Sequence, residues 1–399
     1  SLSSLIASTA PIDSLAISAT ASATLASAGI VCITSLPRSR TTSSIVIALI
    51  AGLLVLRRGP ASTEVVEHDV LGRQLIPGIV DCHAHITGGG GEDGASTKVA
   101  APLAETYFAA GVTSVVGLLG TDDITRSTEE LLAGVRALRE EGLSAWCWTG
   151  GYHYPLTTLT GSPREDIVHI DAVIGVGELA ISDHRSSQLT LDEVLRTASD
   201  CHVGGLIARK AGVLHLHLGD GKRGLDLILQ ALEQSELPAR VFHPTHVNRQ
   251  RALFNEALEL TKLGCHIDVT AFPIEDGDGA ISAADALREY LASNLPGNLI
   301  SVSSDGGGCL PVFDEQGRMV KYDVGTSASL LETLNDLTDS GVALERALPA
   351  FTSNPAEHLR LDGKGRIAVG YDADLVVLEG DGSVASVFTA AETHYKNNN

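Results

Sequence analysis

Short apolar runs alternate with amphipathic helical patterns from residue 74 onward, and this alternation restricts the chain to a few architectures. Eight runs rich in Val and Ile have the length of strands: residues 74–80, 113–119, 144–149, 173–178, 213–218, 240–244, 266–270 and 300–304. Eight strands with intervening helices predict an α/β fold of the (β/α)8, TIM-like barrel type. A doubly wound open sheet is the alternative, but no G-x-G-x-x-G motif follows the first run.

The predicted helices carry their own start signals. Ser127 and Glu130 have the spacing of a capping box at the start of a helix expected over residues 127–141. A pair of the same type opens a helix expected over residues 191–201. The last helix is expected near residues 344–361. These signals separate the strands cleanly, as a barrel requires.

The barrel is expected to occupy residues 74–361, with a small β-sandwich domain built from the segments on either side. Residues 362–399 return to short strands and turns, and we expect them to pair with N-terminal strands from residues 1–73. The N-terminal segment is atypical, since 26 of its first 44 residues are Ser, Ala or Thr. An apolar run at residues 45–56 predicts buried strands, with an aberrant or poorly ordered terminus as the alternative.

Charge and cysteine usage exclude several classes of partner. Lys and Arg number 28 and Asp and Glu 49, so the net charge is −21, which repels nucleic-acid phosphates and acidic membrane surfaces. The apolar run at residues 45–56 is shorter than the roughly 20 residues that cross a bilayer. The six cysteines include no C-x-x-C pair, which favours a reducing compartment, the cytoplasm. We therefore expect neither a nucleic-acid partner nor a membrane.

Histidines and an aspartate stand where the predicted strands end. His83 and His85 follow the first run, and their spacing of two residues places both side chains on one side. His217 ends the fifth strand, His246 the sixth and Asp305 the eighth. The carboxyl ends of barrel strands open onto one face, where active sites are built. Imidazole and carboxylate ligands without thiolate favour zinc or a similar metal.

Four longer motifs surround these residues: D-x-H-x-H at 81–85, G-E-L-A-I-S-D-H-R at 177–185, P-T-H-V-N-R at 244–249 and S-S-D-G at 303–306. Together they resemble the amidohydrolase superfamily, and closely its isoaspartyl (β-aspartyl) dipeptidase branch. The resemblance extends from about residue 62 to about residue 384, and the first 61 residues do not share it. It implies a barrel enzyme that hydrolyses β-aspartyl dipeptides, which are its small-molecule partner.

The resemblance also implies two Zn²⁺ ions per chain with a hydroxide bridging them. The implied ligands are His83, His85 and Asp305 for the more buried ion, and His217 and His246 for the second. Asp305 would take the proton of the hydroxide and deliver it to the leaving amine. Tyr152 would donate a hydrogen bond to the carbonyl oxygen as it becomes an oxyanion.

Two positions depart from the family pattern. The bridging ligand is usually a carboxylated lysine, but Glu178 stands at that position, and its carboxyl carbon reaches roughly 3–4 Å less far from the backbone. Either the metals or the strand would shift, or a single metal binds. Cys309 stands where the branch usually has Ser, and its thiol is bulkier and donates weakly, which leaves the fine substrate preference open.

A β-aspartyl dipeptide carries one ammonium and two carboxylates, so its site needs an anion and at least one guanidinium. By resemblance, Glu92 holds the ammonium, and Arg185 and Arg249 pair with the carboxylates. Thr121 and Gly90, which belongs to the glycine run before Glu92, add hydroxyl and backbone donors. We count Cys309 among the residues that contact the substrate.

Two other functions stay open at this point. A related amidohydrolase acting on a cyclic amide or an N-acyl amino acid would not need Glu92, Arg185 and Arg249 together. A non-catalytic metal-binding or ligand-binding relative would result if the exchange of lysine for Glu178 abolished turnover. A homo-oligomer is expected, of a size that the sequence does not set.

Overall fold

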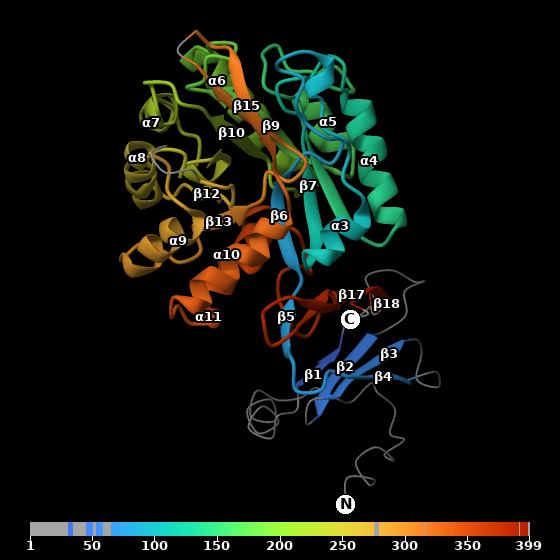
Figure 1. Cartoon of the computed structure of the whole chain (residues 1–399). Coiled ribbons are helices and arrows are strands. Elements are labelled where there is room, and N and C mark those ends of the chain that lie inside the picture. The colour runs from blue at the N-terminus through green and yellow to red at the C-terminus, as the bar shows by residue number, and fades with distance from the viewer. Residues whose placement is uncertain are drawn as a thin grey trace, which may run out of the picture.

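Eight strands form the wall of a barrel, one at each of the predicted positions (Figure 1). The computed structural model describes residues 31–34, 45–50, 53–58, 65–274, 279–314, 316–390 and 392–397. The wall consists of β6 (Ile79–Ala84), β7 (Val112–Gly117), β8 (Ser144–Thr149), β9 (Val173–Ile181), β10 (Val213–Leu218), β11 (Phe242–Thr245), β12 (Ile267–Thr270) and β13 (Ile300–Ser303).

The strands run parallel in the order β11-β10-β9-β8-β7-β6, and β12 pairs with β13. Two backbone hydrogen bonds complete the ring. The N–H of Asp305, after β13, donates to the carbonyl of His83 in β6 (3.1 Å), and the N–H of Val247, after β11, donates to the carbonyl of Asp268 in β12 (3.3 Å). The expected TIM-like barrel is confirmed.

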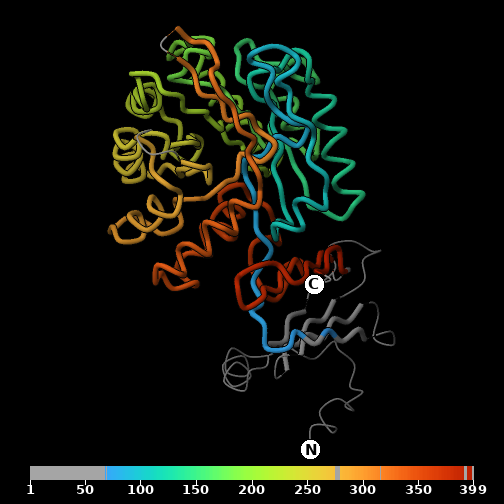
Figure 2. Tube along the Cα trace, in the orientation of Figure 1, coloured from blue at the N-terminus to red at the C-terminus, as the bar shows by residue number. Residues whose placement is uncertain are grey.

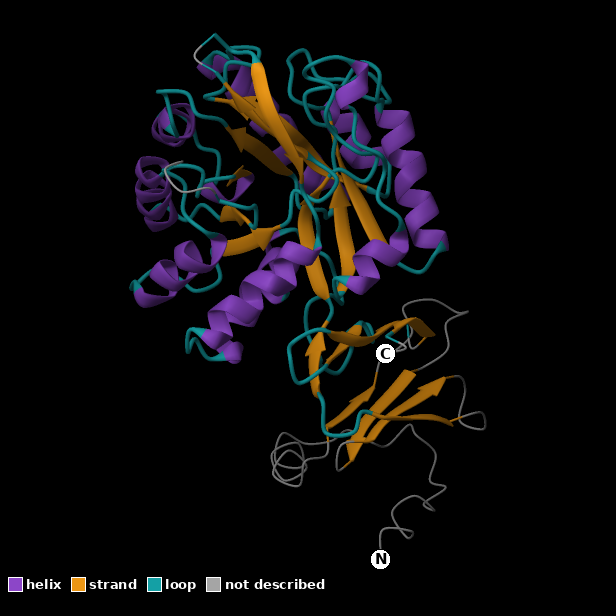
Figure 3. Cartoon of the chain, viewed as in Figure 1, coloured by secondary structure: helices purple, strands orange, loops and turns teal. Residues whose placement is uncertain are grey.

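The helices lie around the outside of the strands (Figure 3). They are α3 (Ala104–Ala109), α4 (Thr128–Glu140), α5 (Pro163–His169), α6 (Leu191–Ala208), α7 (Asp226–Glu233), α8 (Arg251–Lys262), α9 (Ala283–Ala292), α10 (Ala328–Asp339), α11 (Leu344–Ala347) and α12 (Ser353–His358). Short 3₁₀ turns are η2 (Ala95–Thr97), η3 (Ala239–Val241) and η4 (Leu348–Phe351). No helix in the described ranges is long and apolar enough to cross a membrane.

Two helices differ from their predicted extents. Helix α6 continues seven residues past the predicted end at residue 201, and in this extension a Cβ on Gly205 would lie 2.5 Å from the Cα of Gly212. The predicted helix over residues 344–361 is instead α11, η4 and α12, since Pro349 and Pro355 interrupt it. The capping box of Thr190 with Glu193 is present, and the Ser127 hydroxyl accepts from the N–H of Glu130.

The barrel wall buries side chains on both of its surfaces. Between the wall and the helices lies the larger apolar cluster. The smaller cluster fills the interior and is capped by α12 and the residues after it: Val80, Cys82, Val116, Leu118, Trp148, Ile174, Ala211, Val213, Ala356, Leu359 and Leu361. Because strand side chains alternate, His215 and His217 share the interior side of β10 with Val213. The polar site therefore lies above a layer of apolar side chains inside the barrel.

A four-stranded antiparallel sheet lies beside the barrel (Figure 2). It combines one strand that precedes the barrel in the sequence with three strands that follow it. Its order is β18-β17-β16-β5, with β5 (Gln74–Pro77), β16 (Leu375–Leu378), β17 (Val384–Thr389) and β18 (Glu392–Lys396). The strand predicted over residues 74–80 is thus divided, and its first half leaves the barrel. Pro77 has no backbone N–H to donate to a neighbouring strand. A Cβ on Gly78 would lie 1.9 Å from Thr113 Oγ1. The chain passes from one sheet to the other at these two residues.

The other described N-terminal strands pair among themselves in the order β1-β2-β3-β4. They are β1 (Val31–Thr34), β2 (Ile45–Ile50), β3 (Leu53–Arg58) and β4 (Val65–Asp69). The apolar run at residues 45–56 therefore forms strands, as predicted. The expectation that the C-terminal segment pairs with strands of residues 1–73 is wrong for the described residues, because its partner is β5. Residues 1–30 lie outside the described part.

A hairpin that the sequence analysis did not foresee follows β13. Its strands are β14 (Cys309–Phe313) and β15 (Met319–Val324), which pair with each other in antiparallel fashion. The hairpin extends from the barrel mouth past β9 (Figure 1). It brings Cys309 and its neighbours to the edge of the cavity described below.

Candidate metal centre and active site

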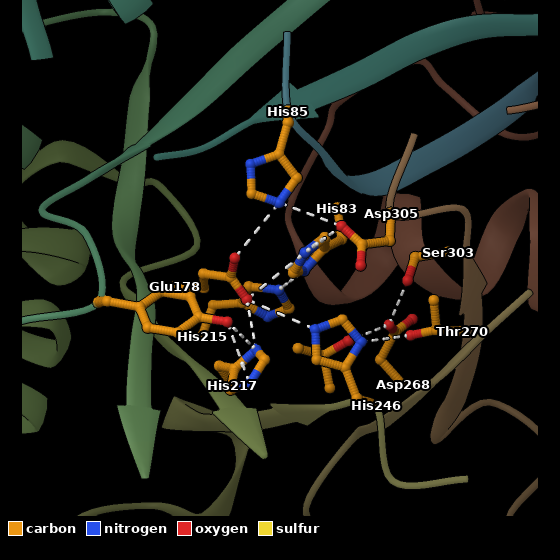
Figure 4. A network of polar contacts seen from close by, with 12 residues as sticks. His83, His85, Glu178, His215, His217, His246, Asp268, Thr270, Ser303 and Asp305 are labelled. Carbon is orange, nitrogen blue, oxygen red and sulfur yellow. Dashed lines mark hydrogen bonds and ion pairs between the residues drawn. The ribbon is translucent and has the colours of Figure 1, made fainter. Parts of the chain in front are cut away.

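Six side chains predicted as metal ligands meet at the carboxyl end of the barrel (Figure 4). They come from the end of β6 (His83 and His85), from β9 (Glu178), from β10 (His217), and from the turns after β11 and β13 (His246 and Asp305). All six are buried. The chain brings together residues more than 200 positions apart because every strand ends on the same face.

Glu178 lies at the centre of the cluster. Its Oε2 is 2.9 Å from His217 Nδ1 and 3.5 Å from Nε2 of both His83 and His246. Its Oε1 is 3.4 Å from His85 Nε2. Burial alone would raise the pKa of the Glu178 carboxyl, but the surrounding histidines hold it well below its usual value. One carboxylate therefore contacts all four predicted histidine ligands.

Asp305 completes the cluster through contacts with His85 and His83. Its Oδ1 is 3.1 Å from His85 Nε2 and 3.5 Å from His83 Nε2. Burial disfavours the charged form of Asp305, but contacts with these two histidines lower its pKa below the usual range. Two of the clustered residues have left-handed backbone conformations, His246 with φ 60° and Asp305 with φ 52°. Such strain is typical of functional sites, where the turn aims a side chain inward.

The donor set fits divalent cations. Three groups have ligand atoms within 4.8 Å of one another: His83, His85 and Glu178; His83, His246 and Asp305; and Glu178, His217 and His246. His83 Nε2 and Asp305 Oδ1 are buried without a well-formed hydrogen bond to any described residue. Four imidazoles and two carboxylates, with no thiolate among them, are ligands that suit zinc and similar metals.

A further Cys82–His243–Asp268 group lies deeper in the barrel. There Asp268 Oδ1 accepts from Ser301 Oγ (2.5 Å) and Cys82 Sγ (3.3 Å), and Oδ2 accepts from Thr245 Oγ1 (2.7 Å) and Ser303 Oγ. These four donors satisfy the carboxylate. The group is therefore explained as a hydrogen-bonded support below the ligand cluster.

Tyr152, after β8, projects into the same site. Its hydroxyl lies 2.9 Å from His217 Nδ1 and 3.1 Å from His217 Nε2. Burial raises the pKa of the Tyr152 phenol well above its usual value, so the hydroxyl keeps its proton. It is thus a hydrogen-bond donor beside the ligand cluster.

A cavity of about 770 Å³ opens above the cluster, and the residues predicted to bind substrate line it: Gly90, Glu92, Thr121, Arg185, Arg249 and Cys309. Glu92 Oε1 accepts from Thr121 Oγ1 (3.2 Å) and from Arg185 Nη1 (3.4 Å). Among the described residues, Arg249 Nη1 lies 3.8 Å from Asp220 Oδ2. Arg249 Nε is buried and has no hydrogen-bond partner in the described part of the chain.

Asp183 was not singled out from the sequence although it lies inside a quoted motif. Its Oδ2 contacts Arg185 Nη2 (2.7 Å) and His217 Nε2 (3.1 Å), so it connects the arginine predicted to bind substrate to the predicted ligand cluster. These two neighbours hold the pKa of Asp183 far below its usual value, against the effect of burial. The signal was available, since an Asp two residues after a fully buried strand rarely lacks a partner.

The hairpin residues were missed as well. Phe313 of β14 lies against Arg185, whose guanidinium carbon is 5.3 Å from the ring centre, while the Tyr152 ring lies 5.4 Å away from the same carbon. Two aromatic rings therefore flank the Arg185 guanidinium. Leu310 and Val312 add an apolar wall to the cavity. No spacing rule links this hairpin to the barrel motifs.

Comparisons with known proteins agree with this geometry. The family model described as Amidohydrolase family matches residues 74–394. A beta-aspartyl dipeptidase from the thermophilic keratin-degrading Fervidobacterium islandicum AW-1, solved in complex with beta-Asp-Leu dipeptide, is 40% identical, with 92% of this chain and 97% of that chain covered and a TM-score of 0.80. Another structure of a beta-aspartyl dipeptidase from AW-1 is 38% identical over the same shares, with a TM-score of 0.77. An allantoinase from Bacillus velezensis is 24% identical, covering 79% of this chain and 76% of that protein.

Proposed function

This chain belongs to the amidohydrolase family, and from that premise we propose that it is a metal-dependent enzyme hydrolysing the isopeptide bond of β-aspartyl dipeptides. The observation that carries the proposal is the cavity above the histidine cluster, whose lining includes the carboxylate of Glu92 and the guanidinium groups of Arg185 and Arg249. A β-aspartyl dipeptide presents the complementary set, one ammonium and two carboxylates. The similar F. islandicum enzyme was solved with such a dipeptide.

Charge complementarity assigns the substrate contacts. Glu92 faces the ammonium, with Thr121 and Arg185 holding its carboxylate in place. Arg249 is the more available of the two arginines for pairing with a substrate carboxylate, because Asp220 is 3.8 Å away and the Asp220 side chain is 66% exposed. Arg185 is oriented by Asp183 and stacked between rings, so it presents one edge of its guanidinium to the second carboxylate.

The histidine cluster would hold the metal. In this proposal His83, His85 and Asp305 bind one divalent ion, His217 and His246 bind a second, and Glu178 lies between them. Bound there, two zinc ions would supply Lewis acidity and an activated, shared water for hydrolysis.

The protein's own groups carry the protons. Asp305 is kept ionised by its histidine neighbours, so it can accept the proton of the attacking water and return it to the leaving amine. Tyr152 keeps its proton and donates a hydrogen bond to the substrate oxygen as negative charge develops. Both groups lie on the wall of the same cavity.

The position of Glu178 supports its role as a bridge despite its short side chain. Its two oxygens lie 2.9–3.5 Å from nitrogens of four histidines. A metal bound about 2 Å from each donor would fit between such pairs with small movements.

Metal analysis combined with a substrate panel tests this function. The zinc-loaded chain should release free aspartate from β-Asp-Leu and other β-aspartyl dipeptides, and should leave the matching α-aspartyl dipeptides intact. Turnover of cyclic amides or N-acyl amino acids without β-aspartyl activity would contradict it. Metal binding without hydrolysis of any of these compounds would identify a non-catalytic relative.

We also propose a reducing compartment, the cytoplasm. The cysteines Cys82, Cys147, Cys201, Cys265 and Cys309 are free, and all but Cys309 are buried. Free thiols in these positions are compatible with a reducing environment. The homo-oligomer stays a prediction.

A further inference from the structure

Three histidines form a hydrogen-bonded chain that leads from the ligand cluster into the barrel. His83 Nδ1 lies 2.8 Å from His215 Nε2, and His215 Nδ1 lies 3.0 Å from His243 Nδ1. All three are buried, at 0% exposure. Figure 4 shows His215 beside His83 and Glu178. The ring that carries a predicted ligand nitrogen is thus attached, through its other nitrogen, to two further imidazoles.

Which ring donates in each of these hydrogen bonds decides whether His83 can bind a metal. A neutral imidazole has one N–H and one lone pair, so each hydrogen bond fixes the roles of the next ring. If His83 donates from Nδ1, then His215 accepts at Nε2 and donates from Nδ1 to His243. His83 Nε2 is then a free lone pair facing Glu178 and Asp305. In the reverse direction His83 Nε2 carries the proton and cannot ligate.

We propose that His215 is a positioning residue, which holds His83 as the Nδ1–H tautomer and thereby aims the Nε2 lone pair at the metal. The inference rests on the proposed metal site and is independent of which amide is hydrolysed. Groups that accept from the distal nitrogen of a metal-bound histidine orient the ring and increase its basicity. Here the acceptor is another imidazole, where a carboxylate or carbonyl is more usual.

The surroundings of His215 fix its ring plane. Trp148 stacks on it, with ring centres 4.9 Å apart and an interplanar angle of 11°. Trp148 is itself held by a hydrogen bond from Nε1 to the carbonyl of Cys82 (3.3 Å). A Cβ at Gly177 would lie 2.7 Å from the Cβ of His215 and 3.0 Å from its carbonyl oxygen, so glycine lets β9 approach β10 closely at this point.

The series of hydrogen-bonded histidines ends at His243. The surroundings of His243 Nε2 determine the free-energy cost of the arrangement. In the metal-competent direction His243 carries its proton on Nε2, which is buried without a hydrogen-bond partner in the described residues. The imidazole of His358 lies close by, with ring centres 4.6 Å apart at 63°. Metal binding at His83 would stabilise this direction over the reverse one.

Two substitutions at one position test the proposal. His215→Gln can place its side-chain oxygen near the position of Nε2 and accept from His83, whereas His215→Leu removes the acceptor. We expect His215→Leu to bind zinc about 10- to 100-fold more weakly in chelator competition, and His215→Gln to stay within a few-fold of wild type. His266→Leu is the matched control, because His266 is equally buried and touches His243 only by ring contact. It should bind zinc like wild type.

Thermal unfolding of the metal-free variants shows whether each one folds. If folded His215→Leu keeps wild-type zinc affinity, or if His215→Gln loses as much as His215→Leu, the proposal is wrong. A measurement on the unaltered protein stands beside the variants. Nitrogen-15 NMR of the histidine-labelled, zinc-loaded chain should show Nδ1–H on His83 and His215 and Nε2–H on His243. The opposite tautomer at His215 would overturn the proposal even if the zinc affinities agreed with it.

Discussion

The floor and the rim of the cavity are built differently. The floor consists of the ligand cluster on strand ends, with side chains at most 8% exposed, and it is held by contacts between strands. The rim consists of Glu92, Arg185, Arg249 and Cys309, which lie in loops or in the hairpin, and the exposure of its charged side chains rises from 8% for Glu92 and 11% for Arg185 to 23% for Arg249. The predicted metal ligands are thus held by contacts with one another, while Arg249 on the rim is the predicted substrate-binding charge most open to the cavity.

The largest effect is expected on the floor, from Glu178→Gln. The amide is nearly isosteric but neutral, so it no longer offsets the charge of two metals held close together. We expect the variant to lose at least one zinc per chain and nearly all turnover. Metal analysis after dialysis, with steady-state kinetics, checks this. A variant with both metals and normal turnover would show that another residue bridges them.

Asp305→Asn should follow, with turnover lower by about two orders of magnitude or more and an intact fold. The amide cannot accept the proton of the attacking water, and it weakens one metal contact. Kinetics on the zinc-saturated variant separate these effects, because excess zinc compensates for the weakened metal contact but not for the lost proton acceptor. Activity within a few-fold of wild type would remove Asp305 from the proton-transfer role.

The rim is tested by Arg249→Met and Arg185→Met. Losing a charge-assisted pair with a substrate carboxylate costs about 1.5–3 kcal/mol, roughly 10- to 150-fold in kcat/KM. Both variants should keep their zinc, which distinguishes the rim from the floor. Arg185→Met also leaves Asp183 and Glu92 without their cation, so it should be the more disruptive of the two. Full efficiency of both variants, together with good turnover of cyclic amides, would favour the alternative function.

The floor was more predictable from sequence than the rim. Its histidines follow apolar runs, and parallel strands in a barrel end on one face, so periodicity alone groups them. Glu178 was located only by counting back from Arg185 in a resembling motif. The rim depends on loops and on β14 and β15, whose side chains are mostly exposed and whose path no periodicity sets. The change of sheet at Gly78 could not be predicted from the sequence for a similar reason, since it depends on the contact with Thr113 in another strand.

The smallest expected effect, none at all, concerns bicarbonate and is specific to this floor. A carbamate bridge forms only when a lysine amine captures carbon dioxide, so an enzyme that relies on it needs bicarbonate for full metal loading. Glu178 has a carboxylate already, with a reference pKa of about 4.3 that the neighbouring histidines lower further. The metal-free chain should therefore take up about two zinc ions without bicarbonate, at a rate that added bicarbonate does not change. Stopped-flow zinc uptake in degassed and bicarbonate-supplemented buffer measures this. A bicarbonate-dependent rate, or uptake of one zinc only, would show that Glu178 does not replace the carbamate.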